Sequence, residues 1–271
     1  MSNETNKLAI VAGNGDLTAL LVKSAKEQGF NTCAIAITDE AQNKLEGLCD
    51  KLYKFSPGQL SKMLNLIKDE MIKQVVFIGK VPKIDLLRNI HKLDWLAIKH
   101  LSSLSNLNDD AIHNSVIDLL NKIDVKVLPQ TDFLKHLFLE KEILSKRIPT
   151  LEERIDIEYG YELAKQVASL DIGQTVVVKN KMTLAIEAIE GTDEAIKRGC
   201  LLAKLGAIVV KVSKPNQDKR FDIPTIGENT IETIAKYNGS ILAFEANETI
   251  VVNKDRLIEL ANKHNICLLS I

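Results

Sequence analysis

The sequence predicts an α/β protein, in which a Rossmann-like N-terminal domain with a parallel sheet precedes a C-terminal α/β domain with a mixed sheet. In the first half, short and continuously apolar runs alternate with helical stretches, which is typical of a parallel sheet covered on both faces. In the second half, a tight turn joins two apolar runs into a hairpin, which adds an antiparallel pair. We predict domains at residues 1–143 and 144–271, because Lys146, Arg147 and Pro149 interrupt the pattern near that junction.

The first half reads as strands and helices in alternation. Strand-length apolar runs lie at residues 8–12, 32–37, 74–78 and 125–128, and helical stretches lie at 17–28 and 57–71, in a longer region after the third strand, and at 109–123. Gly29 closes the first helix, Pro57 is placed in the first turn of the second, and Gly79 ends the third strand.

The second half begins with an amphipathic helix and continues with the hairpin. Apolar residues recur at spacings of four and three along one helical face, at Leu151, Ile155, Tyr159, Leu163, Val167 and Leu170. Asn180 and Lys181 form the predicted turn between strands 175–179 and 182–189. The remaining predictions are helices at 192–205, 228–237 and 254–264 and strands at 207–212, 241–245, 249–252 and 266–269.

Composition argues against several classes of protein. A net charge of −1 provides no basic surplus, so we expect no nucleic-acid partner. No segment approaches the roughly 20 apolar residues of a membrane-spanning helix, and the polar start is unlike a secretory signal. The four cysteines are scattered and form no CxxC pair, which is typical of reduced core thiols. These features predict a cytoplasmic protein.

The turn Gly13-Asn14-Gly15 follows the first strand and precedes the first helix. Backbone N–H groups at such a turn, with the positive end of the helix dipole, suit a phosphate or pyrophosphate. Thr18 stands where the dinucleotide fingerprint has its third glycine, whereas Asp39 lies near the expected place of a ribose-binding acid. The turn therefore permits a nicotinamide cofactor, and a tight turn without a ligand is the alternative.

Gly79-Lys80 ends another strand of the same predicted sheet. Open α/β sheets bind ligands at the carboxyl ends of their strands, which makes these two residues candidates for ligand binding. The alternative is that Lys80 is an ordinary solvated lysine.

The segment from Lys214 to Gly227 is the strongest candidate for chemistry. Its two prolines disfavour a continuous helix, and an extended chain would place Asp218, Arg220 and Asp222 on one face. Two carboxylates can hold Mg²⁺, which takes few protein ligands, and a guanidinium can bind a phosphate through its planar fork. The alternative is a surface loop with a local ion pair.

Several acids lie upstream, at a predicted junction between a strand and a helix. Glu187, Glu190 and Asp193 flank Thr192, which is a candidate helix cap, and acids in a first turn complement the helix dipole. This structural explanation is sufficient by itself. If the acids cluster with the segment 214–227, they would supply a further metal contact.

Other common site motifs are absent from the sequence. The five histidines show neither HxxxH nor HxH spacing, so we expect no zinc site. The chain contains neither GxSxG nor a Walker A motif, which gives no support for a serine hydrolase or an ATPase.

Five stretches of the chain resemble one protein family, in order and along the whole length. They are AGNGD (12–16), FIGKV (77–81), DIGQTVVVK (171–179), EAIEGTDE (187–194) and VKVSKPNQDKRFDIPT (210–225). The family is the UDP-2,3-diacylglucosamine pyrophosphatase of lipid A biosynthesis, in its LpxI form. The C-terminal stretches are specific, whereas the glycine turn is a weak signal alone.

This resemblance implies a Mg²⁺-dependent hydrolase that splits UDP-2,3-diacylglucosamine into UMP and 2,3-diacylglucosamine 1-phosphate (lipid X), with water attacking the sugar-side phosphorus. It also implies a homodimer whose two domains hold the lipid product between them. Because the substrate is embedded in the membrane, we expect peripheral contact with the inner face of the inner membrane. Thr18 replaces a usual proline and Cys200 a usual glycine, but neither touches the expected chemistry.

The family's essential aspartate, in its RFDxP motif, corresponds to Asp222. We expect Asp222 to bind Mg²⁺ or position the attacking water, with Asp218 assisting and Asp193 as a further metal contact. Arg220 and Lys214 would stabilise negative charge on the phosphates. The Gly13–Gly15 turn, including Asn14, would hold a nucleotide or sugar phosphate. The other expected substrate-binding residues are Gly79, Lys80, Thr192 and Gln217.

Two other functions stay open at this point. An NAD(P)-dependent oxidoreductase would use the N-terminal domain, and NADH or NADPH would then raise its melting temperature. A nonenzymatic nucleotide or lipid carrier would bind UDP-diacylglucosamine without splitting it.

Overall fold

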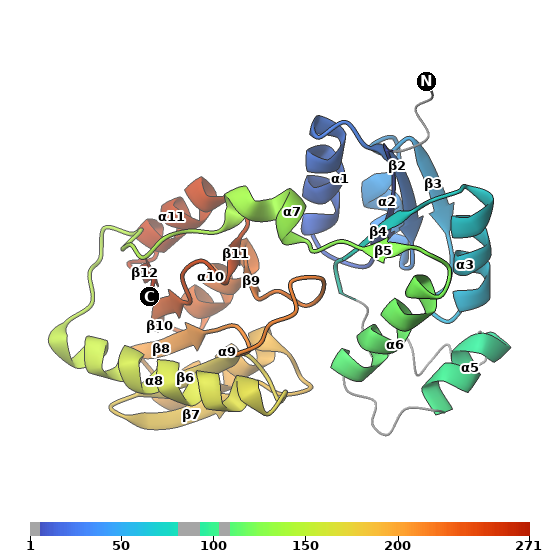
Figure 1. Cartoon of the computed structure of the whole chain (residues 1–271). Helices are drawn as coiled ribbons and strands as arrows, with labels where there is room; N and C mark the ends of the chain where they lie inside the picture. Colours follow the sequence, from blue (N-terminus) through green and yellow to red (C-terminus); the bar gives the residue numbers. More distant parts are fainter. Residues whose placement is uncertain (1–5, 81–92, 103–108) are drawn as a thin grey trace. The chain divides into compact units, whose positions relative to one another are not determined.

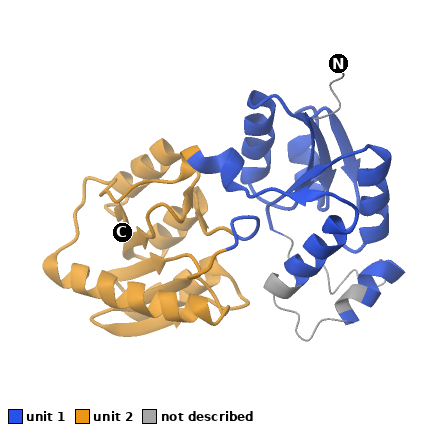
Figure 2. Ribbon diagram, viewed as in Figure 1, with its two compact units in different colours: residues 1–135, 218–222 blue, residues 136–217, 223–271 orange. Residues whose placement is uncertain are grey.

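A computed structural model describes residues 6–80, 93–102 and 109–271 of the chain. The chain forms two compact units, which are drawn in Figures 1 and 2. Unit 1 consists of residues 1–135 and 218–222, and unit 2 consists of residues 136–217 and 223–271. Five residues from the second half of the sequence therefore belong to the unit that the first half builds.

Unit 1 contains a five-stranded sheet in the order β3-β2-β1-β4-β5, and every pair of neighbours is parallel. The strands are β1 (Lys7–Ala12), β2 (Asn31–Ala36), β3 (Lys51–Lys54), β4 (Gln74–Ile78) and β5 (Lys126–Val127). Its helices are α1 (Leu17–Glu27), α2 (Asp39–Leu45), α3 (Leu60–Asp69), α5 (Trp95–Ser102), α6 (Asp109–Asn121) and α7 (Thr131–Leu134). The predicted parallel sheet is confirmed, whereas β3 and α2 were not predicted.

Burial on both faces explains why the strands of unit 1 read as continuous apolar runs. Ala9 and Val11 of β1 pack in one core with residues of α3, α5 and α6. The alternate residues, Leu8 and Ile10, point the other way and are also fully buried. A strand covered on both sides loses the alternation of apolar and polar residues that a half-exposed strand shows.

Two helix predictions in unit 1 need comment. The helix expected at 57–71 begins at Leu60 with Gln59 as its N-cap, so the prediction that Pro57 lies in its first turn is wrong. The longer helical region expected after Gly79 falls partly on residues 81–92 and 103–108, which lie outside the described residues.

Unit 2 contains a mixed five-stranded sheet in the order β12-β10-β8-β6-β7. Strands β8, β10 and β12 are parallel, and β6 is antiparallel to both of its neighbours, which confirms the predicted mixed sheet. The strands are β6 (Thr175–Lys179), β7 (Met182–Ile186), β8 (Ala207–Lys211), β10 (Gly239–Phe244) and β12 (Cys267–Ser270), with β9 (Thr225–Ile226) and β11 (Ile250–Val251) in a separate pair. The helices are η3 (Lys135–Leu137, which begins at the end of unit 1), α8 (Leu151–Ser169), α9 (Thr192–Ala203), α10 (Glu228–Lys236) and α11 (Lys254–Lys263).

The hairpin of unit 2 has the predicted two-residue turn. Asn180 and Lys181 both have left-handed φ angles, 51° and 57°, as a type I′ turn requires. The carboxylate of Asp156, on α8, accepts hydrogen bonds from both turn amides at 2.6 and 2.7 Å. This buried aspartate fixes the turn to the helix that packs beside it.

No helix in the described ranges has both the length and the apolar character that crossing a bilayer would need.

Candidate functional site at the end of strand β4

The two glycine turns of unit 1 are locked together by their main chains. Asn14 and Lys80 exchange two backbone hydrogen bonds of 2.8 Å each, and the Gly13 amide donates to the carbonyl of Ile78 at 2.8 Å. A Cβ at Gly13 would lie 2.5 Å from the Lys80 carbonyl oxygen, and one at Gly79 would lie 2.6 Å from that of Asn14. Only glycine permits so close an approach of two backbones.

These turns lie at the switch point of the sheet. Strand β1 is followed by β2 on one side, whereas β4 lies on its other side, so the strand order reverses between β1 and β4. Ligands of open α/β sheets bind outside the carboxyl ends of the strands at this point. The expectation that Gly13–Gly15 and Gly79–Lys80 share one edge is therefore confirmed; their roles in binding stay predictions.

The amide of Gly15 already has an anionic partner. It donates to the Glu40 carboxylate at 3.1 Å, and Lys44 pairs with both Glu40 (2.8 Å) and Asp16 (2.6 Å). These contacts lower the pKa of Glu40, chiefly through the hydrogen bond from Lys44 and then through that from Gly15. A phosphate or pyrophosphate on this turn would meet a carboxylate at the Gly15 donor, which disfavours both the oxidoreductase alternative and the expected phosphate role of Gly15.

Asn14 presents a different group at the same turn. Its side-chain oxygen Oδ1 is buried and has no hydrogen-bond partner among the described residues. Buried polar atoms in folded proteins nearly always have a partner, so an exception calls for a physical explanation. A bound ligand or water that donates a hydrogen bond to this oxygen would provide one.

The segment 218–222 is a turn and not the extended chain that we predicted. The Phe221 amide donates to the Asp218 carbonyl at 3.1 Å, which closes a four-residue turn. Asp218 and Arg220 nevertheless face each other, since the guanidinium donates to both carboxylate oxygens, Nε to Oδ1 at 2.9 Å and Nη2 to Oδ2 at 2.7 Å. The hydrogen bonds from Arg220 lower the pKa of Asp218 against the opposing effect of burial.

Contacts of Gln130 and of the Phe221 ring anchor this turn in unit 1. The Gln130 amide donates to the Lys219 carbonyl at 2.8 Å. The Phe221 ring stacks on His113, with centroids 4.1 Å apart, and contacts Phe77 of β4 at 5.1 Å. Phe77 lies two residues before Gly79, so the turn and the two glycine motifs meet around the end of β4.

Asp222 follows the anchored turn and has two unusual properties. It is exposed, although Phe221 and Ile223 on either side are buried. Its φ is +44°, a left-handed backbone conformation that costs most residues free energy. The fold therefore holds this carboxylate outward at a strained position beside the ligand-binding edge.

Unit 2 collects the other predicted residues in a separate polar group. Lys211, at the end of β8 and only 5% exposed, donates to the Thr192 hydroxyl at 2.9 Å, and Thr192 donates to Glu187 at 2.7 Å. The N-cap of α9 is Gly191, so the prediction that Thr192 caps this helix is wrong. The hydroxyl instead links a buried ammonium to a carboxylate.

Lys214 and Gln217 belong to the same group. Lys214 pairs with Asp171 at 2.5 Å, and the Gln217 side chain accepts a long hydrogen bond of 3.5 Å from Gln174. A Cβ at Gly173 would collide with the Glu187 carbonyl, which explains the glycine between Asp171 and Gln174. The DIGQT stretch therefore joins the residues around Glu187 to those around Lys214.

The described residues contain no group of three or more His, Cys, Asp or Glu side chains arranged to hold a metal ion. Asp193 lies in the first turn of α9, where its carboxylate accepts from Asn229 at 3.2 Å. Both oxygens of Asp218 are engaged by Arg220. The metal roles of Asp193, Asp218 and Asp222 stay predictions.

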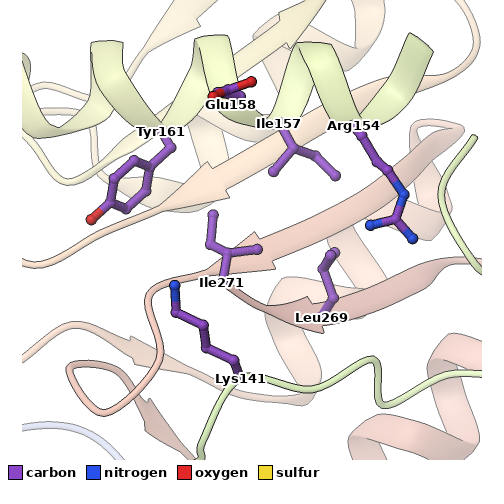
Figure 3. Close-up of a pocket in the computed structure, with 7 residues that line it drawn as sticks. All are labelled: Lys141, Arg154, Ile157, Glu158, Tyr161, Leu269 and Ile271. Carbon is purple, nitrogen blue, oxygen red and sulfur yellow. The ribbon is translucent and has the colours of Figure 1, made fainter. Parts of the chain in front are cut away.

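A cavity of about 300 Å³ lies elsewhere in unit 2, between α8 and β12 (Figure 3). Its lining combines the apolar side chains of Ile157, Leu269 and Ile271 with the cations Lys141 and Arg154. None of the predicted site residues lines it.

The sequence analysis did not single out three residues that contact predicted site residues. Gln130 and Glu40 contact predicted site residues but lie in none of the five family stretches, and Lys211 lies in the stretch 210–225 without having been singled out. Pro129, which precedes Gln130, follows the end of the predicted strand 125–128. Glu40 is adjacent to Asp39, which we considered as a ribose-binding acid. Their contacts depend on side chains far apart in sequence, which no spacing pattern reports.

The two sheets define a two-unit α/β protein whose first unit is Rossmann-like, with the switch point of its sheet between β1 and β4. The models of the LpxI N-terminal and C-terminal domains match residues 7–137 and 140–269. The chain therefore belongs to the LpxI family. A relative from Caulobacter vibrioides, the UDP-2,3-diacylglucosamine pyrophosphatase LpxI, is 27% identical over 98% of this chain and 97% of its own length.

Two of the solved structures similar to this chain are distant likenesses. The biotin carboxylase subunit of pyruvate carboxylase is 14% identical, with a TM-score of 0.29, over 64% of this chain and 34% of that one. The N5-carboxyaminoimidazole ribonucleotide synthetase from Thermotoga maritima is 16% identical, with a TM-score of 0.28, over 68% of this chain and 41% of that one. The chain spans well under half of these structures, and such scores support no functional inference.

Proposed function

We propose that this protein hydrolyses the pyrophosphate bond of UDP-2,3-diacylglucosamine and releases UMP and 2,3-diacylglucosamine 1-phosphate. Membership of the LpxI family and the name of the Caulobacter relative support the substrate. The observation that carries the proposal for the site is the position of the RFDIP segment. Its Asp222 is held outward in unit 1, where the neighbouring Phe221 contacts the strand that ends in Gly79-Lys80.

The proposed roles follow from what each group can do. Asp222 positions the attacking water and accepts its proton, because its carboxylate is exposed and is the acid of the RFDIP segment. Arg220 contributes positive charge near the phosphates through Nη1, which takes no part in its pair with Asp218. Asn14 accepts a hydrogen bond from the nucleotide or sugar through its buried oxygen.

These residues are compatible with only one way of binding Mg²⁺, in which the protein supplies few ligands. A cage of three or more protein ligands has no support in the described residues. Mg²⁺ often binds through one or two carboxylates, with water and substrate phosphates completing its octahedron, and Asp222 can serve as that carboxylate. When bound, Mg²⁺ would neutralise phosphate charge and acidify a coordinated water. Asp218 would become a second Mg²⁺ ligand only if its ion pair with Arg220 were broken.

The test is incubation with UDP-2,3-diacylglucosamine and Mg²⁺, with and without a chelator, in water enriched in ¹⁸O. We expect UMP and the sugar 1-phosphate in equal amounts, with the heavy oxygen in the sugar 1-phosphate, as attack on the sugar-side phosphorus requires. Binding without any product would favour a carrier. A homodimer and peripheral contact with the inner membrane belong to this proposal, and sedimentation and vesicle flotation test them.

A further inference from the structure

Hydrogen bonds within the turn close it just before Asp222. The Phe221 amide donates to the Asp218 carbonyl, the Arg220 amide donates to Asp218 Oδ1 at 2.9 Å, and the Arg220 guanidinium pairs with the Asp218 carboxylate. Contacts inside the turn cannot fix it against the sheet of unit 1. Contacts from outside the turn must therefore hold Asp222 at the end of β4.

Gln130 supplies such contacts through both its main chain and its side chain. Its main-chain amide donates to the Lys219 carbonyl at 2.8 Å. Its side-chain Nε2 donates to the Phe77 carbonyl in β4 at 2.9 Å and more weakly to the Arg220 carbonyl at 3.4 Å. The main-chain and side-chain amides of Gln130 together connect Phe77 of β4 to the two central residues of the turn.

The environment of Gln130 makes this connection rigid. The residue is only 5% exposed, so water does not compete well for its hydrogen bonds. Pro129 precedes it, and the Leu128 amide donates to the Val75 carbonyl of β4, which fixes the main chain beside the sheet. Gln130 also accepts from the Leu134 and Phe133 amides at the start of α7.

We propose that Gln130 is a positioning residue for hydrolysis, which fixes the carbonyls of Lys219 and Arg220 so that Asp222 keeps its outward, left-handed conformation. This inference rests on the proposed function, in which Asp222 acts on water. Gln130 itself contacts no substrate atom in this account. Small displacements of a reacting group can cost about a hundredfold in rate, so a loose turn should lower turnover more than binding.

The experiment uses the full chain and two substitutions, Gln130→Ala and Gln130→Met. Gln130→Met keeps most of the side-chain volume and the main-chain bond to Lys219 but removes the side-chain donor to the Phe77 and Arg220 carbonyls, which separates positioning by the side chain from packing. We expect both variants to lower kcat about tenfold to a hundredfold with little change in KM. Amide hydrogen exchange in a peptide covering residues 217–223 should become faster in both, which a general loss of stability would not confine to this peptide.

Gln28→Ala is the matched control. Gln28 also donates from its side chain to a main-chain carbonyl in unit 1, that of Asp132 at 3.1 Å, but it makes no contact with the turn. It should leave kcat and the exchange of residues 217–223 unchanged. The inference is overturned if Gln130→Met hydrolyses the substrate at the wild-type kcat, or if it raises KM alone. If the wild-type protein itself releases no UMP, the proposed function fails first.

Discussion

The carboxyl edges of the two sheets are built in different ways. At the edge of unit 1, main chains approach closely through Gly13 and Gly79. The buried Oδ1 of Asn14 has no hydrogen-bond partner among the described residues, and the carboxylate of Asp222 is exposed. At the edge of unit 2, charged side chains satisfy one another. Glu245 accepts from Lys165 at 2.9 and 3.0 Å and from the Ser213 amide at 2.8 Å.

This difference teaches that polar residues at a sheet edge do not by themselves mark a reacting site. In unit 2 the polar groups hold the start of the segment that leads to the turn, so they support the main chain. In unit 1 the close contact of the two glycine turns supports the main chain, and the carboxylate of Asp222 is exposed. The proposed function therefore places the chemistry at the unit 1 edge and gives the unit 2 edge a structural role.

The backbone contact in unit 1 can be broken most severely by Gly13→Ala. The added Cβ would lie 2.5 Å from the Lys80 carbonyl oxygen, and main chain cannot move aside as a side chain can. We expect a loss of about 3 kcal/mol or more in the free energy of unfolding, measured by urea denaturation. Gly227→Ala is the control, since no atom lies within 4 Å of its added Cβ. Equal stability of the two variants would refute the interlocked turns.

The ionic scaffold of unit 2 can be broken by Lys165→Met. This change leaves the Glu245 carboxylate, whose side chain is only 13% exposed, without its cation. We expect a loss of about 3 kcal/mol in stability, while kcat measured well below the melting temperature stays unchanged. A strong loss of kcat in a fully folded Lys165→Met protein would move chemistry to unit 2 and contradict the comparison.

The ligand-facing group of unit 1 is tested by Asn14→Ala. Because Oδ1 has no partner among the described residues, its removal should cost the free protein little stability. The same change should weaken binding of UMP or of the sugar 1-phosphate about tenfold, as measured by calorimetry with each ligand. Unchanged affinity for both ligands would show that this oxygen faces neither of them.

The smallest effect is expected for the Asp218–Arg220 pair. Arg220 lowers the pKa of Asp218 in the folded protein, so the pair stabilises the fold above the ordinary aspartate pKa of about 3.9. This contribution is lost as pH falls through the lowered folded pKa. Both side chains are about a third exposed, and we expect less than about 1 kcal/mol. The stability difference between wild type and Asp218→Asn should be constant from pH 7 to 5 and shrink at lower pH; a difference that grows on acidification would contradict the sign.

The sequence predicted those features that local patterns encode. Continuous apolar runs indicated a parallel sheet, and Asn180-Lys181 indicated the hairpin, because strand burial and turn chemistry are local properties. The pattern could not show that residues 218–222 fold as a turn within unit 1, since their contacts with Gln130 and His113 join residues far apart in sequence. The alternation argument correctly expected Asp218 and Arg220 to face each other, but its extended geometry was wrong, and the catalytic roles of these residues and Asp222 stay predictions.

The central claim is that Asp222 acts on the water that splits the pyrophosphate. The most direct measurement is single-turnover release of UMP from UDP-2,3-diacylglucosamine by Asp222→Asn, compared with wild type at equal substrate occupancy. The variant keeps the shape of the side chain, and Asn tolerates the left-handed φ of +44°, so folding should be unaffected. We predict a rate lower by at least about a hundredfold with an unchanged melting temperature. UMP release at the wild-type rate by the folded variant would contradict the account.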